Sequence, residues 1–177
     1  MLKKRLVELG AALALCLSAA VAAPQAASAA PAPTATGSAT TIRAADLDPA
    51  KATMIAASTL ATSGCGSSCD GRNPATYKIY YNGSDYYTCA EDAITAAQNT
   101  SGINLELRYS PRCRTAWARV SSDFYYPTVR SYYSDGRVRT SYSGFAGSYY
   151  TMMVNDAGLL ARAEATAGSG TWYTSKY

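Results

Sequence analysis

The sequence contains no histidine, only two phenylalanines, and no apolar run of the roughly 20 residues that a membrane-spanning helix needs. The absence of histidine excludes a Ser-His-Asp triad, a Cys-His pair and any histidine-ligated metal. The sequence also lacks a G-x-S-x-G motif and a phosphate-binding glycine loop. We therefore expect no cofactor, no bound metal and no membrane anchor.

Charged residues are also sparse, at 16% of the chain, and the formal net charge is +4. Three of the basic residues and one acidic residue fall within the first 29 positions, which leaves 13 basic and 11 acidic residues, a net charge of +2, in 30–177. That excess is too small to attract nucleic acid or an anionic membrane over a long range. We therefore expect no nucleic-acid partner.

The N-terminal segment has the pattern of a secretory signal peptide. Lys3, Lys4 and Arg5 precede an apolar run over 9–23 that contains Cys16, and Ala27-Ser28-Ala29 has the small-x-small form of a cleavage site. We predict a signal peptide over 1–29 and a secreted, extracellular protein. An earlier small-x-small site, Ala20-Val21-Ala22, is the alternative.

Residues 30–63 are predicted to be a linker or N-terminal arm. The stretch 30–43 is rich in Ala, Pro, Thr and Ser and has almost no large apolar side chain, which is typical of disorder. Residues 44–62 favour one short helix, with Asp48 as its N-cap and Pro49 as its first residue.

Four cysteines remain after the predicted cleavage site: Cys65, Cys69, Cys89 and Cys113. An even number of cysteines in an exported chain indicates two disulfide bonds. Three pairings are possible, and we favour Cys65–Cys69 with Cys89–Cys113. A zinc site is the competing interpretation, and an oxidising compartment disfavours it.

From residue 64 onwards, Tyr, Thr, Ser and Val replace helix-forming residues, which predicts a single mainly-β domain over 64–177. Asn82-Gly83 and Asp135-Gly136 are hairpin turns, and a third hairpin is predicted near 155–158. Residues 103–110 alternate apolar and polar side chains, as in a half-buried strand. The segment 90–99 fits either a helical turn or a strand. We expect a small sandwich or barrel of about six to eight antiparallel strands, held by the disulfides.

Tyrosine is the main large apolar residue of the domain, with fifteen copies in the chain. Because neighbouring residues of a strand face opposite sides, each Tyr-Tyr doublet should place one ring in the core and one in water. The doublets occupy 80–81, 86–87, 125–126, 132–133 and 149–150.

The segment 107–120, LRYSPRCRTAWARV, has two interpretations. In the structural one it is a strand, a turn and a strand pinned by Cys113, with Trp117 buried and one arginine paired with Glu106. In the functional one its arginines line an anion site beside an aromatic floor of Tyr109 and Trp117. The candidate binding arginines are Arg108, Arg112, Arg114 and Arg119.

Three segments together resemble the YjfA-like family of uncharacterised, mostly secreted proteins of Gram-positive bacteria. They are CGSSCDGRNP at 65–74, CAEDAIT at 89–95 and LELRYSPRCRTAWARV at 105–120. The resemblance is close over 65–120 and loose over 121–177. One departure is the tyrosine-rich insert 75–88, which separates Pro74 from Cys89. The resemblance implies a small secreted β domain and brings no activity, ligand or catalytic residue.

These observations favour a secreted, non-catalytic module that binds a cell-wall component or an extracellular protein, because tyrosine and tryptophan are favoured at interfaces. A secreted inhibitor is the alternative, with an exposed loop in 75–88 or 110–112. A carboxylate-dependent hydrolase is a third reading, for which two acidic side chains must face each other across a cleft. We predict no catalytic residue.

Overall fold

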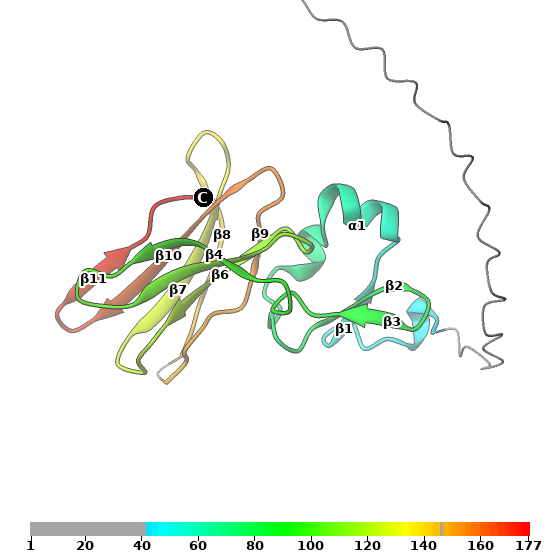
Figure 1. The fold of residues 1–177 in the computed structure, drawn as a ribbon, viewed down its shortest axis with the longest axis horizontal. Helices are drawn as coiled ribbons and strands as arrows, with labels where there is room; N and C mark the ends of the chain where they lie inside the picture. Colours follow the sequence, from blue (N-terminus) through cyan, green and yellow to red (C-terminus); the bar gives the residue numbers. More distant parts are fainter. Residues whose placement is uncertain (1–41, 146) are drawn as a thin grey trace, which may run out of the picture. The chain divides into compact units, whose positions relative to one another are not determined.

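The computed structural model describes residues 42–145 and 147–177, all of which lie within a compact unit of residues 38–177 (Figure 1). The predicted signal peptide, Cys16 and nearly all of the linker 30–43 lie outside the described residues. The described chain is mainly β, as predicted, with strands arranged in three sheets. Its helices are α1 (Ala57–Ser63) and the 3-10 turns η1 (Ala44–Asp46) and η2 (Gly66–Cys69). Its strands are β1 (Ala52–Met54), β2 (Lys78–Asn82), β3 (Asp85–Tyr87), β4 (Ile94–Asn99), β5 (Leu105–Ser110), β6 (Thr115–Val120), β7 (Tyr126–Tyr132), β8 (Val138–Ser143), β9 (Val154–Asn155), β10 (Leu160–Ala167) and β11 (Gly170–Tyr173).

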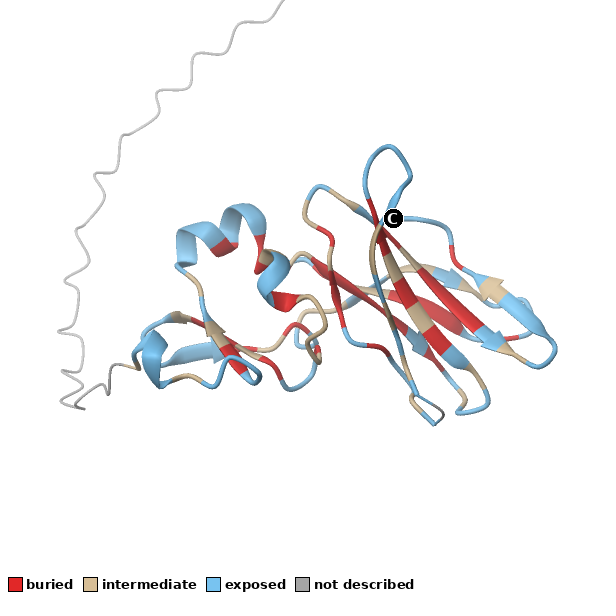
Figure 2. Cartoon of the chain, turned by 180° about the vertical axis from the view of Figure 1, so that it is seen from behind, coloured by how far each residue is buried: buried red, intermediate tan, exposed pale blue. Residues whose placement is uncertain are grey.

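Two four-stranded antiparallel sheets form a sandwich. Sheet B has the order β4-β5-β6-β9, and sheet C has the order β11-β10-β7-β8. Their facing sides share one hydrophobic core (Figure 2). Small side chains make up much of it: beside leucines and valines, the core contains Ala116, Ala118, Ala161, Ala163 and Ala165.

A second core lies on the other side of β6. The three-stranded sheet A, in which β1 runs parallel and β3 antiparallel to β2, meets helix α1 and Trp117 there. Both disulfides, Cys65–Cys69 and Cys89–Cys113, lie within this second core, and the favoured pairing is confirmed.

Gly64 ends helix α1 directly against the backbone of Cys113. Its φ is +64°, and an added Cβ would lie 2.0 Å from the Cys113 carbonyl oxygen. The next residue, Cys65, donates its N–H to that same carbonyl at 3.0 Å. Glycine is therefore required at this position, both for the backbone conformation and for the close approach of the two chain segments around Gly64 and Cys113.

The N-terminal arm differs from the prediction of one helix over 44–62. Asp48 begins a turn instead, residues 52–54 form strand β1, and the helix begins only at Ala57. The strand forms because an unpaired edge of β2 is available, and the parallel ladder Ala52 to Lys78 supplies hydrogen bonds that a helix with few apolar residues could not outweigh.

The predicted third hairpin near 155–158 is wrong in its pairing. Strand β9 pairs with β6 in sheet B, whereas β10 pairs with β7 in sheet C, so the chain crosses from one sheet to the other at Asp156. The hairpins at Asn82-Gly83 and Asp135-Gly136 are present as β2–β3 and β7–β8. The ambiguous segment 90–99 contains strand β4. The sandwich has eight strands, within the predicted range of six to eight, and sheet A adds three further strands.

The tyrosine doublets mostly obey the alternation of a strand. Tyr87 and Tyr132 are buried, and their neighbours Tyr86 and Tyr133 are exposed. The doublet at 149–150 does not, because both of its side chains are exposed and it lies largely outside a regular strand.

We expect the Cys89–Cys113 disulfide to stabilise the domain more than Cys65–Cys69. The two bridges span sequence separations of 24 and 4. Loop-closure entropy then predicts a loss of about 3 to 4 kcal/mol for the Cys89→Ser, Cys113→Ser double variant and about 2 kcal/mol for the Cys65→Ser, Cys69→Ser variant. Urea denaturation of both variants measures this difference. Equal unfolding midpoints for the parent and the Cys89/Cys113 variant would contradict it.

Candidate functional site

The outer face of sheet B is organised around one buried glutamate, Glu106, which is 7% exposed. Arg119 binds its carboxylate with two hydrogen bonds of 2.8 Å, from Nε and Nη2. Arg108 lies 3.6 Å from the same carboxylate and donates to the Ala93 carbonyl at 2.8 Å. The arginine side chains thus shield the buried charge from water.

A small pocket of about 170 Å³ opens beside this cluster. Arg108, Trp117, Arg119 and Tyr150 line it together with Pro74 and three alanines. Trp117 is otherwise buried in the second core, as the structural interpretation of 107–120 predicted. Three of the candidate binding residues therefore meet here, but their two guanidinium groups already share Glu106.

The other two arginines lie elsewhere. Arg112 places its guanidinium 4.6 Å from the ring centre of Tyr87, and its backbone N–H donates to Asp92 at 2.8 Å. Arg114 has a left-handed φ of 53° and donates to the Thr62 carbonyl at 2.6 Å. The structure thus divides the four arginines among three places.

Tyr109 points into the sandwich, away from the outer face of sheet B. Its ring packs against the core and lies 5.1 Å from the ring of Tyr177. Burial raises the pKa of its hydroxyl, and a hydrogen bond with Arg114 partly offsets that rise. Tyr109 therefore does not form a floor with Trp117, which lies on the opposite face.

The outer face of sheet C carries a group of aromatic and cationic side chains that we name the tyrosine face. The register of β7, β10 and β11 places these side chains on one side of the sheet, because residues directly opposite in a ladder share a face. The tyrosine face consists of Tyr126, Arg130, Tyr132, Arg162 and Tyr173, with Lys176 beyond the end of β11.

Cations lie against two rings of this face, those of Tyr132 and Tyr173. The Lys176 ammonium lies 4.0 Å from the ring centre of Tyr132, which is itself buried, and Arg162 lies 4.6 Å from that of Tyr173. Tyr126 and Tyr173 remain 51% and 45% exposed. Burial raises the pKa of Tyr132, so its hydroxyl stays protonated at neutral pH.

Glu164 stands in the middle of the tyrosine face and is 7% exposed. It accepts hydrogen bonds from Arg130 at 2.9 Å and from Arg162 at 2.7 Å. With Lys176, the tyrosine face carries three cations and one carboxylate, so it is positive overall.

The sequence analysis did not single out this face. Alternation within 126–132 gives Tyr126, Arg130 and Tyr132 a common side, and that signal was available. The contribution of Arg162 and Tyr173 depends on which strands pair, which the sequence does not show.

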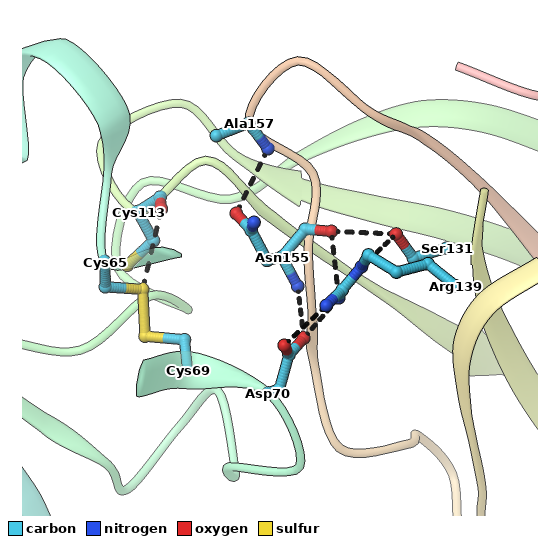
Figure 3. A network of polar contacts seen from close by, with 8 residues as sticks. All are labelled: Cys65, Cys69, Asp70, Cys113, Ser131, Arg139, Asn155 and Ala157. Atoms are coloured by element: carbon cyan, nitrogen blue, oxygen red, sulfur yellow. Dashed lines mark hydrogen bonds and ion pairs between the residues drawn. A yellow bond between two sulfur atoms is a disulfide. The ribbon is translucent and has the colours of Figure 1, made fainter. Parts of the chain in front are cut away.

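A separate polar network joins the turn η2 to both sheets of the sandwich (Figure 3). Asp70 accepts two hydrogen bonds from Arg139, at 2.8 and 2.6 Å, and a third from the backbone N–H of Asn155 at 2.8 Å. Ser131 and Arg139 in turn donate to the Asn155 carbonyl. This network fixes the crossing of the chain from β9 to β10.

Asp156 lies at that crossing and is 6% exposed, and its Oδ1 has no hydrogen-bond partner among the described residues. Burial raises the pKa of its carboxyl to about 7, although Arg114 and Arg139 act in the opposite direction. Asp156 was expected to be a turn residue, and the turn is present, but its burial was not foreseen.

Three carboxylates of the described chain, those of Glu106, Glu164 and Asp70, do not form the paired arrangement of a glycosidase. Glu106 and Glu164 lie on the outer faces of different sheets, and arginines bind both of them. Asp70 is occupied by Arg139. These three carboxylates therefore hold the fold together, and none of them faces another across a cleft.

The cysteine sulfurs of Cys65, Cys69 and Cys89 lie within 4.8 Å of one another, a spacing that a metal ion could use. Each of these sulfurs is engaged in a disulfide bond, however, so none is a free thiolate. The zinc interpretation is not supported by this arrangement.

The model of a family of proteins of unknown function, DUF2690, matches residues 67–166, which include sheet B and most of sheet C and of the second core. The chain belongs to the DUF2690 family. No curated protein and no solved structure matches it. Membership in DUF2690 adds no activity or ligand, and the resemblance to the YjfA-like family stays a prediction. Among the residues that the structure describes, no helix has the length and apolar character needed to cross a membrane.

Breaking the Asp70–Arg139 pair should destabilise the domain far more than breaking an exposed pair. Both side chains are largely buried, so Arg139→Gln leaves an uncompensated carboxylate, at a cost of about 3 kcal/mol. Arg137→Gln is the matched control, since its pair with Asp135 is exposed and should contribute little to stability. Urea denaturation measures both. Equal losses would show that the network does not carry this stability.

Asp156 should make the domain less stable as the pH rises from about 4 to about 7. Within that window the unfolded chain releases the Asp156 proton and the folded chain retains it, so ionisation favours unfolding by up to about 4 kcal/mol. The stabilising effect of the buried acid is complete below pH 4 and is lost as the pH passes through 7. Asp156→Asn should flatten this part of the stability curve, as measured by urea denaturation at several pH values. A variant curve that parallels the parent curve would exclude a raised pKa.

Proposed function

We propose that this DUF2690 chain is a secreted, non-catalytic module that binds a polysaccharide of the cell wall on its tyrosine face. The observation that carries the proposal is the pair of half-exposed rings, Tyr126 and Tyr173, on one face of sheet C. Two strand spacings separate their strands, about 10 Å across the sheet. An extended polymer lying over the sheet can contact both rings.

The surroundings of the two rings suit a polar, hydroxyl-rich ligand. Thr128 and Ser143 pair across β7 and β8 at 2.9 Å, and Thr166 and Thr171 pair across β10 and β11 at 3.3 Å. These hydroxyls lie on the same face as the rings and can both donate and accept hydrogen bonds. Flat apolar area beside such hydroxyls is the combination that a sugar ring needs.

The compartment is part of the proposal. Two disulfides are typical of an oxidising environment, which agrees with the signal peptide predicted over 1–29. In such a compartment the protein would meet wall polymers directly. The positive charge of the tyrosine face would add attraction for an anionic polymer, in a salt-dependent way.

A protein partner is the second candidate, and a different observation favours it. The only two phenylalanines of the chain, Phe124 and Phe145, are each 81% exposed. Both lie near the same end of sheet C. Phe124 shortly precedes the start of β7, and Phe145 shortly follows the end of β8. The Gly144 N–H donates to the Pro127 carbonyl and joins these two strand ends. Large exposed apolar side chains of this kind are typical of an interaction site.

The inhibitor alternative has less support. The insert 75–88 forms the β2–β3 hairpin and buries Tyr77 and Tyr87, and the turn at 110–112 is held by Asp92 and the Cys113 disulfide. Neither segment is an isolated exposed loop.

The test measures how the secreted protein partitions onto insoluble peptidoglycan, chitin and cellulose at low and high salt. We expect retention on one of these polymers, and the Tyr126→Ala, Tyr173→Ala double variant should lose about tenfold or more in affinity, since each aromatic anchor contributes about 1 kcal/mol or more. Tyr86→Ala is the matched control, because Tyr86 is equally exposed but lies on sheet A.

The outcomes separate the candidate functions. Retention that survives high salt and depends on the two tyrosines supports stacking, whereas retention that salt abolishes assigns the binding to Arg130, Arg162 and Lys176. No retention on any of the three polymers rejects the polysaccharide proposal. In that case capture of a protein partner that the Phe124→Ser, Phe145→Ser variant loses would support the second candidate.

A further inference from the structure

A pocket with mainly apolar walls lies beside the second core, outside the tyrosine face. It has a volume of about 290 Å³ and lies between helix α1, the β2–β3 hairpin and the turn at Pro111. Ala57, Leu60 and Ala61 line one side, and Tyr81 and Tyr87 line another. This size is at the lower end of the range for small-molecule sites.

One cation borders this pocket. The Arg112 guanidinium stacks on Tyr87 at 4.6 Å, and within the described residues no carboxylate lies at ion-pair distance from it. Its backbone N–H, not its side chain, binds Asp92. The other arginines of the segment 107–120 are held by Glu106 or by a backbone carbonyl, so Arg112 differs from them.

A second donor in the pocket wall also lacks a partner. Tyr87 is 2% exposed, and its hydroxyl oxygen is buried without a hydrogen bond to any described residue. Tyr87 lines the pocket, and a ligand that accepts a hydrogen bond from this hydroxyl would satisfy it. Burial raises the pKa of Tyr87 far above its ordinary value, so the hydroxyl remains a donor.

Negative groups nearby are already engaged. Asp92 accepts hydrogen bonds from the Ser110 hydroxyl and the Arg112 N–H, and Glu91 accepts two from Thr88. Neither of them lines the pocket, whose wall contains one cation and no acid.

We propose that this pocket binds a small organic anion, with its apolar body between helix α1 and Tyr81 and its carboxylate or other acidic group held by Arg112 and the Tyr87 hydroxyl. The apolar wall would contact the apolar body of the ligand, and the two donors without a partner, Arg112 and the Tyr87 hydroxyl, would bind its negatively charged group. A neutral molecule of the same shape would leave the guanidinium without its charge-assisted hydrogen bond.

The experiment uses 4-phenylbutyrate as the probe and 4-phenylbutanol as its neutral counterpart. Each is titrated into ¹⁵N-labelled protein that is secreted by cells expressing the full chain, and amide chemical shifts report both affinity and location. We expect 4-phenylbutyrate to shift amides of α1, β3 and the turn at Arg112, and to bind about tenfold or more tightly than the alcohol.

Two variants test the donors, each with a matched control. Arg112→Gln should remove the preference for the anion, whereas Arg137→Gln, which also loses a guanidinium stacked on a tyrosine, should not. Tyr87→Phe should weaken binding several-fold without lowering the melting temperature, because the hydroxyl has no partner in the free protein. Tyr132→Phe, which removes another buried hydroxyl, should leave the affinity for the probe unchanged.

A third variant tests the pocket itself and does not depend on charge. Ala61 is exposed on helix α1, so Ala61→Phe should fill the pocket without disturbing the core, and binding of 4-phenylbutyrate should be lost. The proposal is overturned if the acid and the alcohol bind equally, if Arg112→Gln keeps the preference, or if no saturable shift occurs at millimolar concentration. It is also overturned if the shifts map to sheet C instead.

Discussion

Strand β6 is buried on both of its faces, and the architecture depends on this. Ala116 and Ala118 point toward sheet C and the sandwich core, whereas Trp117 between them points into the second core beside the disulfides. One strand thus supplies a wall to two hydrophobic cores. Three features hold neighbouring elements beside this strand. The Cys89–Cys113 bridge ties the end of β3 to the β5–β6 turn, and Gly64 lets the end of helix α1 approach that same turn. The Asp70–Arg139 pair joins the turn η2 to β8.

The outer faces of the two sheets of the sandwich share one arrangement of charged side chains. On each face one glutamate, Glu106 or Glu164, is almost fully buried, and two arginines from neighbouring positions cover it. The apolar parts of arginine side chains shield sheet surface while the guanidinium groups satisfy the carboxylate. The difference lies in what remains open. On sheet B the arginines are fully used, whereas on sheet C two tyrosine rings and Lys176 stay accessible, which is why we propose the second face as the binding surface.

Local signals in the sequence predicted much of the fold, and pairings between distant segments were the part that could not be predicted. The turns at Asn82-Gly83 and Asp135-Gly136, the alternation of 103–110 and the disulfides depend on neighbouring residues or on the cysteine count. Strand β9 depends on β6, almost forty residues away, so its apolar residues looked like half of a hairpin with β10. The positions of the candidate binding residues could not be predicted for a related reason. Because side chains alternate along a strand and Arg114 has a left-handed backbone conformation, arginines close in sequence point in different directions. The tyrosine face forms only when β7, β10 and β11 pair in the correct register.

The alanines of the sandwich core have a consequence for how the domain balances its free energy of folding. Five of them lie between the sheets, and each buries little apolar surface compared with leucine or valine. An alanine side chain has no rotamers, so it loses no side-chain conformational entropy when the core forms. At these five positions the small hydrophobic contribution is therefore accompanied by a small entropic penalty, because the side chain has no alternative rotamer to adopt.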